Sequence, residues 1–487
     1  MDNSTQTAIN EKPLNLNYKR TFIIGFAFFG ILLLWQVYDS WCPTLLTELF
    51  KKAFSDADER NVQYLVGIMM ALDNLAALIL LPIFGHLSDK THTKLGKRMP
   101  YILVGTFVCA VAFPFIPVFY HMNNLVGVLI TMFIVVCFMM MYRNPAVALM
   151  PDITPKPLRS KANGIINIMG YIGGAFATIV GLFFVLSEYL GTKMTTLEDG
   201  SKVLAEHTWA YNNIWALEMP FLIASILMVI SALVLLFKVK ENKIEEEMAD
   251  ELRRGEEMSQ TADKVDDDKP LSRANKIMLF LILGAEFFWF MADNGIGTFM
   301  GNYTIYYLGA STRSNMINTI IGGLGSVIGY AIGGYIAGKI GRKWTIFSGL
   351  GLSFISYIIW IIGTFTFLKD AAGSGSFPTI IWVIWFIKGF GMALVHLNSF
   401  PMVVELCNSK KIGAFTGYYY ASSMAAQTIT PIALGSLMLV PSLNWAYLPV
   451  YAALCVLVSM IIFFFVKNVT LNKTKLAKGL EGLGQDD

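Results

Sequence analysis

The chain has 487 residues and is strongly apolar: 55% of the residues are hydrophobic, 15% are charged, and the formal net charge is +3. The mean hydropathy is +0.56. Soluble domains carry about 25% charged residues, so this composition excludes a soluble globular protein. The five cysteines are scattered, and no C-x-x-C or H-E-x-x-H spacing occurs. We therefore predict no disulfide framework, no bound metal or other cofactor, and no enzymatic activity.

Apolar runs of about 20 residues recur along the whole chain, and each is long enough to cross a bilayer as a helix. The sequence therefore predicts an all-α membrane protein with twelve transmembrane helices in two pseudo-symmetric six-helix halves. We place the twelve spans at residues 21–41, 63–84, 101–120, 125–149, 163–186, 217–237, 277–299, 318–337, 345–367, 379–404, 412–437 and 445–466.

The distribution of basic residues tests this topology. With the N-terminus in the cytoplasm, 28 of the 37 lysines and arginines fall in inner segments and 7 in outer loops, and only Arg143 and Lys388 remain inside the spans. Such an excess is what the positive-inside rule expects. We therefore expect a multi-pass protein of the plasma membrane with both termini in the cytoplasm. Because topology accounts for the sequence pI of about 8.4, we predict no nucleic-acid partner.

The spans divide the chain into five parts. We predict a cytoplasmic tail, a first six-helix half, a cytoplasmic linker, a second six-helix half and a second cytoplasmic tail, at residues 1–20, 21–237, 238–276, 277–466 and 467–487. The linker holds clusters of both charges, and a short surface helix is expected around residues 244–258. We favour a solvated connection over a regulatory site.

The two halves repeat one another at an offset of 253–254 residues. The pattern G-x4-W-x3-D occurs at Gly30, Trp35 and Asp39 and again at Gly284, Trp289 and Asp293. Further matched pairs are Gly85 with Gly338, Asp152 with Glu405, and Gly164 with Gly417. Parallel six-helix repeats place a substrate site between the halves near the middle of the bilayer.

A cationic hairpin joins the second and third spans at residues 81–102, LPIFGHLSDKTHTKLGKRMPYI. It resembles the loop-2/3 signature of the major facilitator superfamily. Its longer form is similar to that of the glycoside–pentoside–hexuronide:cation symporters, in particular the branch with sucrose/proton symporters. Tyr38-Asp39 with Pro43, and residues 143–164, also resemble this family, although its functional arginine aligns with Val147 and Arg143 lies one turn earlier.

The resemblance and the repeat together predict a gate on the cytoplasmic side. Charged loops after the second and eighth spans would close that side when the site faces outward; the alternative is that they only orient the protein. The predicted gate residues are Gly85, Asp89, Lys97, Arg98, Asp152, Arg159, Gly338, Arg342 and Glu405.

Ionisable residues inside the spans are costly and usually functional. The acids are Asp39, Asp73, Glu286 and Asp293, and the fixed bases are Arg143 and Lys388. Two acids are thus left without a permanent counter-charge, and a buried unpaired carboxyl tends to hold a proton. We predict that these four acids serve proton coupling. Asp39 lies near the end of its predicted span, so a simple surface acid remains an alternative there.

The predicted substrate-binding residues are Arg143, Asp39, Trp35, Trp289, Asn144, Lys388 and His396. Arg143 offers five donors to hydroxyls or a carboxylate, and His396 is its repeat partner. Tyr38, Tyr142, Trp382 and Trp385 could also stack on a sugar, but only Trp35 and Trp289 precede a matched aspartate by one turn.

The resemblance implies a proton-coupled symporter of a glycoside, such as the disaccharides sucrose or maltose, that works by alternating access. Its partners would be the sugar, protons and the bilayer, and we expect a monomer. The acidic motif that binds sodium in melibiose-type members reads Ala77 and Leu81 here, which favours protons over sodium. A carrier of lipids or other amphiphiles on the same fold is the other alternative.

Overall fold

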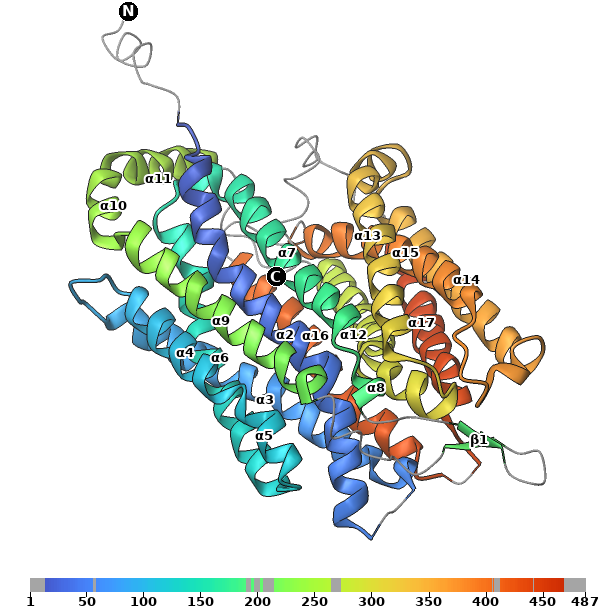
Figure 1. The fold of residues 1–487 in the computed structure, drawn as a ribbon. Coiled ribbons are helices and arrows are strands. Elements are labelled where there is room, and N and C mark those ends of the chain that lie inside the picture. The colour runs from blue at the N-terminus through green and yellow to red at the C-terminus, as the bar shows by residue number, and fades with distance from the viewer. Residues whose placement is uncertain are drawn as a thin grey trace, which may run out of the picture.

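The computed structural model describes residues 14–55, 58–189, 194–196, 202–204, 214–263, 273–404, 406, 412–440 and 442–467. Figure 1 shows two bundles of long helices side by side, with α10 and α11 at one end of the first bundle. The end of the molecule with α10 and α11 is called the linker end here. The opposite end carries a small β-hairpin and is called the hairpin end.

The first half is built from seven helices: α2 (Tyr18–Ala53), α3 (Glu59–Lys90), α4 (Met99–Ala112), α5 (Phe115–His121), α6 (Leu125–Asp152), α7 (Arg159–Phe183) and α9 (Ile214–Lys238). Together α4 and α5 form one span, which is interrupted at Phe113-Pro114, where proline has no N–H to donate to the helical hydrogen bonds. At the hairpin end, α8 (Leu186–Tyr189) precedes the antiparallel strands β1 (Met194–Thr196) and β2 (Lys202–Leu204).

The second half follows the same plan. Its helices are α12 (Arg273–Asn302), α13 (Thr312–Ile340), α14 (Arg342–Phe365), α15 (Thr379–Val404), α16 (Ile412–Leu437) and α17 (Leu448–Phe464). Short helical turns lie at its hairpin end: η3 (Tyr303–Tyr307), η4 (Lys369–Ala371) and η6 (Trp445–Tyr447).

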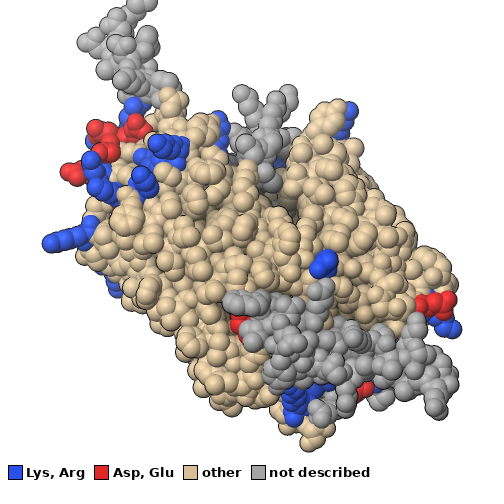
Figure 2. Space-filling view, viewed as in Figure 1, with Lys and Arg blue, Asp and Glu red and all other residues tan. Residues whose placement is uncertain are grey.

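Eleven of the described helical spans are long and apolar enough to cross a membrane. The remaining long helix, α16, has 26 residues but is rich in hydroxyl side chains. Charged side chains gather over α10 and α11, while the broad middle of the surface in Figure 2 is nearly free of them. The all-α membrane fold predicted from the sequence is thereby confirmed.

Several helices are longer than the apolar runs predicted, among them α2 and α3. The α2 helix continues beyond residue 41 to Ala53, and its last turns bury polar Thr44, Thr47 and Glu48. The α3 helix continues through Pro82 to Lys90, so Gly85 and Asp89 lie on its last turns and not in a loop. Hydropathy underestimates the lengths of both helices because their last turns carry polar side chains, which protein covers in α2 and which are largely exposed in α3.

Each half has its own apolar core. The core of the first half also takes in Ile305 and Met316 of the second half, and both lie towards the hairpin end. The cores therefore approach each other at that end.

The linker forms two helices, α10 (Glu241–Glu247) and α11 (Ala249–Asp263), that pack on the first half. The buried carboxylate of Glu241 accepts hydrogen bonds from the backbone N–H groups of Lys97, Arg98 and Met99 at 3.0–3.2 Å. Gly96 permits this contact, because a Cβ there would lie 2.1 Å from the Glu241 carboxylate. Burial raises the pKa of Glu241, and the three N–H donors offset part of that rise. The described part of the linker is therefore docked on the first half. The prediction of a solvated connection is only partly correct.

Candidate functional site

A polar cavity of about 580 Å³ lies between the two halves. The first half contributes residues of α2, α3 and α6, and the second half contributes residues of α12, α13, α15 and α16. Its volume is within the range of about 300–1,000 Å³ that small-molecule sites have. Its charged lining residues are Asp39, Asp73, Arg143, Asp293 and Lys388.

Asp39 lies on the cavity wall of the first half. Because α2 extends to Ala53, this aspartate is 14 residues from the helix end, and the alternative of a surface acid at the end of a span does not hold. Its side chain is nevertheless reached by solvent through the cavity. Within the described part of the chain, no hydrogen bond or ion pair engages its carboxylate.

Asp73 and Arg143 lie on the same wall. Asp73 is 8% exposed, and its carboxylate accepts hydrogen bonds from Asn74, at 2.6 Å from the backbone N–H and 2.9 Å from the side-chain amide. The charges of Asp39 and Arg143 both act on Asp73, with opposite signs. Among the described residues, no hydrogen bond or ion pair holds the Arg143 guanidinium, so its donors face the cavity.

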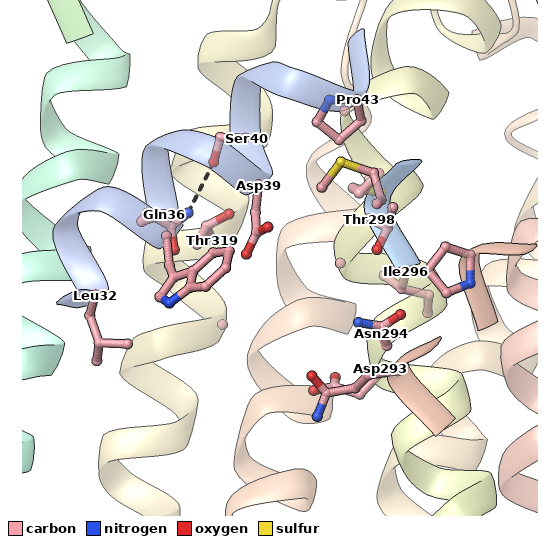
Figure 3. Close-up of a pocket in the computed structure, with 18 of the residues that line it drawn as sticks. Leu32, Gln36, Asp39, Ser40, Pro43, Asp293, Asn294, Ile296, Thr298 and Thr319 are labelled. Carbon is pink, nitrogen blue, oxygen red and sulfur yellow. Dashed lines mark hydrogen bonds between the residues drawn. The ribbon is translucent and has the colours of Figure 1, made fainter. Parts of the chain in front are cut away.

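The wall of the second half is organised differently. Asp293 of α12 forms an ion pair with Lys388 of α15. Asn294 and Trp385 also line the cavity, and the side-chain oxygen of Asn294 is buried without a hydrogen-bond partner in the described chain. Figure 3 shows Asp39 on one side of the cavity and Asp293 with Asn294 on the other.

These charges do not balance. Asp293 and Lys388 neutralise each other, and Arg143 offsets one of the carboxylates on the opposite wall. The other carboxylate has no counter-charge among the described residues. The arrangement can therefore accept one cation or proton together with a polar, hydrogen-bonding ligand.

Four predicted site residues lie away from the cavity lining. Trp289 is fully buried and packs on Phe463 of α17, with ring centroids 6.4 Å apart. Its repeat partner Trp35 does line the cavity, so the repeat places the two aspartates alike but not the two indoles.

The other three have different surroundings. Glu286 is 0% exposed within the second half, and both of its oxygens lack hydrogen-bond partners in the described residues. The His396 ring stacks on Phe290 at 5.3 Å. The side chain of Asn144 donates to the carbonyl of Leu81 at 2.5 Å. These three side chains face the interior of a half, and the structure gives no support for their direct contact with substrate.

The predicted gate residues of the first half form a network at the linker end. Arg98 pairs with Asp89 and, at 2.8 Å, with Asp152. Lys97 lies 3.4 Å from the same Asp152 carboxylate. Arg159 donates to the carbonyl of Thr154 at 3.0 Å. All these contacts lie within the first half.

Of the remaining gate residues, Gly85 lies where two helices are in close contact. Gly338 and Arg342 lie at the loop of the second half that repeats the cationic hairpin. A Cβ at Gly85 would lie 2.6 Å from the Asn144 amide, as expected of a glycine that lets helices approach. In the second half, Gly338 is in the last turn of α13 and Arg342 begins α14. Glu405 lies outside the described residues.

The halves contact each other closely towards the hairpin end. A Cβ at Gly67 of α3 would lie 2.0 Å from the carbonyl oxygen of Pro431 in α16, and one at Gly435 would lie 2.4 Å from the carbonyl oxygen of Gln63. Ser187 and Thr312 bind each other through backbone and hydroxyl groups at 3.0–3.3 Å. The two halves therefore contact each other on the hairpin side of the cavity.

Comparison with protein families identifies the family to which this chain belongs. The model of the Major Facilitator Superfamily matches residues 6–178, 64–366 and 278–483. The chain belongs to the major facilitator superfamily. Comparison with curated proteins finds no match.

Solved structures of major facilitator proteins resemble the chain over nearly its whole length. An inward-open structure of the xylose transporter XylE from E. coli has a TM-score of 0.64 at 15% identity, covering 96% of this chain and 98% of that chain. A peptide transporter POT mutant in complex with alafosfalin has a TM-score of 0.61 at 12% identity, covering 96% and 97%. At such identities the likeness shows the fold alone. As a member of the major facilitator superfamily, this protein is a transporter and not an enzyme.

Several cavity residues were absent from the predicted site, although Trp385 had been named as a residue that could stack on a sugar. Asn74 and Asn294 each follow a predicted aspartate by one position, so those aspartates were the only signal for them. Trp385 precedes Lys388 by three positions, about one helical turn, but it stands in an apolar run with other aromatics. Only the fold shows that Trp385, and not Trp289, supplies the indole of the second half.

Proposed function

We propose that this transporter is a symporter that moves a glycoside, such as the disaccharides sucrose or maltose, together with protons. The observation that carries this proposal is the charge balance of the cavity. Three carboxyls face two basic groups, and Asp39 has no ion pair or hydrogen bond in the described chain. A proton on a cavity carboxyl would remove the excess charge and leave a neutral, polar site suited to an uncharged sugar.

The other lining groups fit a ligand rich in hydroxyls. Arg143 offers five donors that no described residue binds. The indole N–H of Trp35 is buried and has no hydrogen-bond partner in the described structure. Trp385 presents a second indole on the opposite half. Flat rings with a polar edge can pack on the C–H faces of a sugar while their N–H groups bind hydroxyls.

Coupling and binding are assigned residue by residue. We propose that Asp39 and Asp73 carry the coupling proton, and that Asp293 takes part through its pair with Lys388. Asp39, Arg143, Trp35 and Lys388 are proposed to contact substrate. Glu286 remains a predicted coupling residue, although it lies outside the cavity lining.

Orientation follows from the basic residues. Under the positive-inside rule, the linker end and both termini face the cytoplasm, and the membrane is the plasma membrane. With the hairpin end closed, the structure would then represent an inward-facing state. In the outward-facing state, the first-half network of Arg98 and Asp152 would meet the loop of Arg342. The proposal also includes the division of the chain into the five predicted parts and a carrier that works as a monomer.

The two rivals have less support. An amphiphile carrier would need an apolar cavity, whereas this one carries five charged side chains. Sodium coupling would need a cluster of acidic ligands. The described residues contain no group of three or more acids, histidines or cysteines placed to hold an ion, and Ala77 and Leu81 occupy the positions of the melibiose-type motif.

Uptake into proteoliposomes tests the proposal. Radiolabelled sucrose, maltose and other glycosides would be offered with an imposed pH gradient, acidic outside, and separately with a sodium gradient. We expect one glycoside to accumulate with the pH gradient and to equilibrate without it. Accumulation with sodium alone, or of no glycoside, would contradict the proposal.

A further inference from the structure

A buried polar network joins the halves at the hairpin end, and Asn302, the last residue of α12, is at its centre. The side-chain oxygen of Asn302 accepts a hydrogen bond from the Thr44 hydroxyl at 2.9 Å. Its amide nitrogen lies 3.1 Å from both the Thr47 hydroxyl and the side-chain oxygen of Gln63. One side chain of the second half thus binds three side chains of the first half.

All four side chains are out of reach of solvent. Asn302, Thr47 and Gln63 are 0% exposed, and Thr44 is 1% exposed. Buried polar groups are stable when every partner is in place and costly when one is lost. The network therefore favours one arrangement of the two halves, and separating them would require water to replace its hydrogen bonds.

A second contact supports the same closure. Tyr306, in the turn after α12, donates its hydroxyl to the Glu48 carboxylate at 2.5 Å. Glu48 is 3% exposed and lies one turn beyond Thr44 and next to Thr47 on α2. The last turns of α2 are thus held by the end of α12 and by the turn that follows it.

The network also adjoins the cavity. Thr44 lines the cavity, as do Met300 and Gly301, the two residues before Asn302. The hydrogen bond from Thr44 to Asn302 therefore links the cavity wall to the contact between the halves.

We infer that Asn302 is a positioning residue of the transport cycle. It acts as a latch that keeps the hairpin end shut and must release Thr44, Thr47 and Gln63 before substrate can enter from that side. The inference rests on the proposed alternating-access transport through this cavity, but it depends on neither a glycoside nor protons.

The latch predicts a measurable shift between two states. Spin labels at Met122 and Phe367, which are 68% and 62% exposed near the hairpin ends of the two halves, would report their separation in a background without the five native cysteines. The variant Asn302→Leu loses all three hydrogen bonds at similar side-chain volume. We expect its ratio of separated to closed molecules to rise at least about tenfold, measured as a longer component in the distance distribution.

Asn398→Leu is the matched control. Asn398 is also buried in the second half, but its amide donates to Leu394 of its own helix at 2.9 Å. A longer component in Asn302→Leu but not in Asn398→Leu supports the latch. The same distribution in Asn302→Leu as in the parent overturns it, and so does an equal change in both variants, which would indicate general loosening.

A milder variant keeps the test decisive if Asn302→Leu fails to fold. Tyr306→Phe removes only the hydroxyl bound to Glu48, and it should shift the distribution in the same direction by a smaller amount. An unchanged distribution for this variant would then overturn the inference. Because the measurement needs no substrate, failure of the latch and failure of the proposed sugar transport are distinguishable.

Discussion

At the scale of single residues, the acids and bases that line the cavity could be predicted from the sequence. Asp39 and Asp293 follow from the internal repeat, and Asp73, Arg143 and Lys388 are conspicuous because charges inside apolar spans are rare. The structure brings all five to one cavity. The pairing of Asp293 with Lys388 could not be predicted, because it depends on how α12 and α15 face each other.

The unpaired acids should carry the coupling. In Asp39→Asn and Asp73→Asn, the amide cannot exchange a proton, so accumulation against a gradient should be abolished while exchange of internal for external sugar is retained. Uptake and counterflow in proteoliposomes measure both. Asp370→Asn, at an exposed position of η4 outside the cavity, serves as the control. Accumulation at the parent level in both cavity variants would show that the coupling site is elsewhere.

The indole N–H of Trp35 gives a second residue-scale prediction. Trp35→Phe keeps an aromatic ring but removes the donor, and losing one hydrogen bond of about 1 kcal/mol should raise KM about fivefold. Trp344→Phe, at a position 44% exposed on α14, should leave KM unchanged. The contact with substrate is refuted if initial uptake rates give the same KM for Trp35→Phe and the parent.

At the scale of helices, hydropathy located the spans but not their ends. The predicted span ended at residue 41, whereas α2 runs to Ala53 because its polar last turns are covered by the second half. The docking of Glu241 on the start of α4 was not predictable either, since three backbone N–H groups bind it and backbone groups leave no mark in the sequence.

The packing of α3 on α16 leaves no room for a side chain at Gly67. The Cβ of alanine there would lie 2.0 Å from the backbone oxygen of Pro431, so the helices must move apart. Overpacking of this kind costs about 1–3 kcal/mol, and we expect a lower Tm by intrinsic fluorescence. Gly351→Ala is the control, because nothing lies within 4 Å of its added Cβ. An unchanged Tm for Gly67→Ala would refute this packing.

The contact between Glu241 of the linker and the start of α4 leads to a separate prediction. Glu241→Ala leaves three buried N–H groups without their acceptor, at a cost of about 1–3 kcal/mol, so amide hydrogen exchange in α10 and in residues 91–98 should accelerate at least about fivefold. Glu247→Ala removes a 62% exposed partner of Lys243 and should have little effect. Equal exchange in the two variants would mean that Glu241 does not hold the linker in place.

At the scale of the whole molecule, the internal repeat predicted two halves with a substrate site between them, and the fold has two halves with a cavity between them. The repeat did not predict how the halves differ. Asp39 is unpaired while Asp293 is paired, and Trp35 lines the cavity while Trp289 lies in a core. These differences arise from neighbours such as Lys388 and Phe463, which have no counterpart in the repeated pattern.

The central claim is that sugar and protons move together through this cavity. The most direct test records the pH outside lightly buffered vesicles holding the purified protein while sucrose, maltose or related glycosides are added. Symport carries protons inward with the sugar, so we expect the outside to become alkaline, and Asp39→Asn to abolish the change. No change in pH with any glycoside, in vesicles that take up that glycoside, would contradict proton coupling.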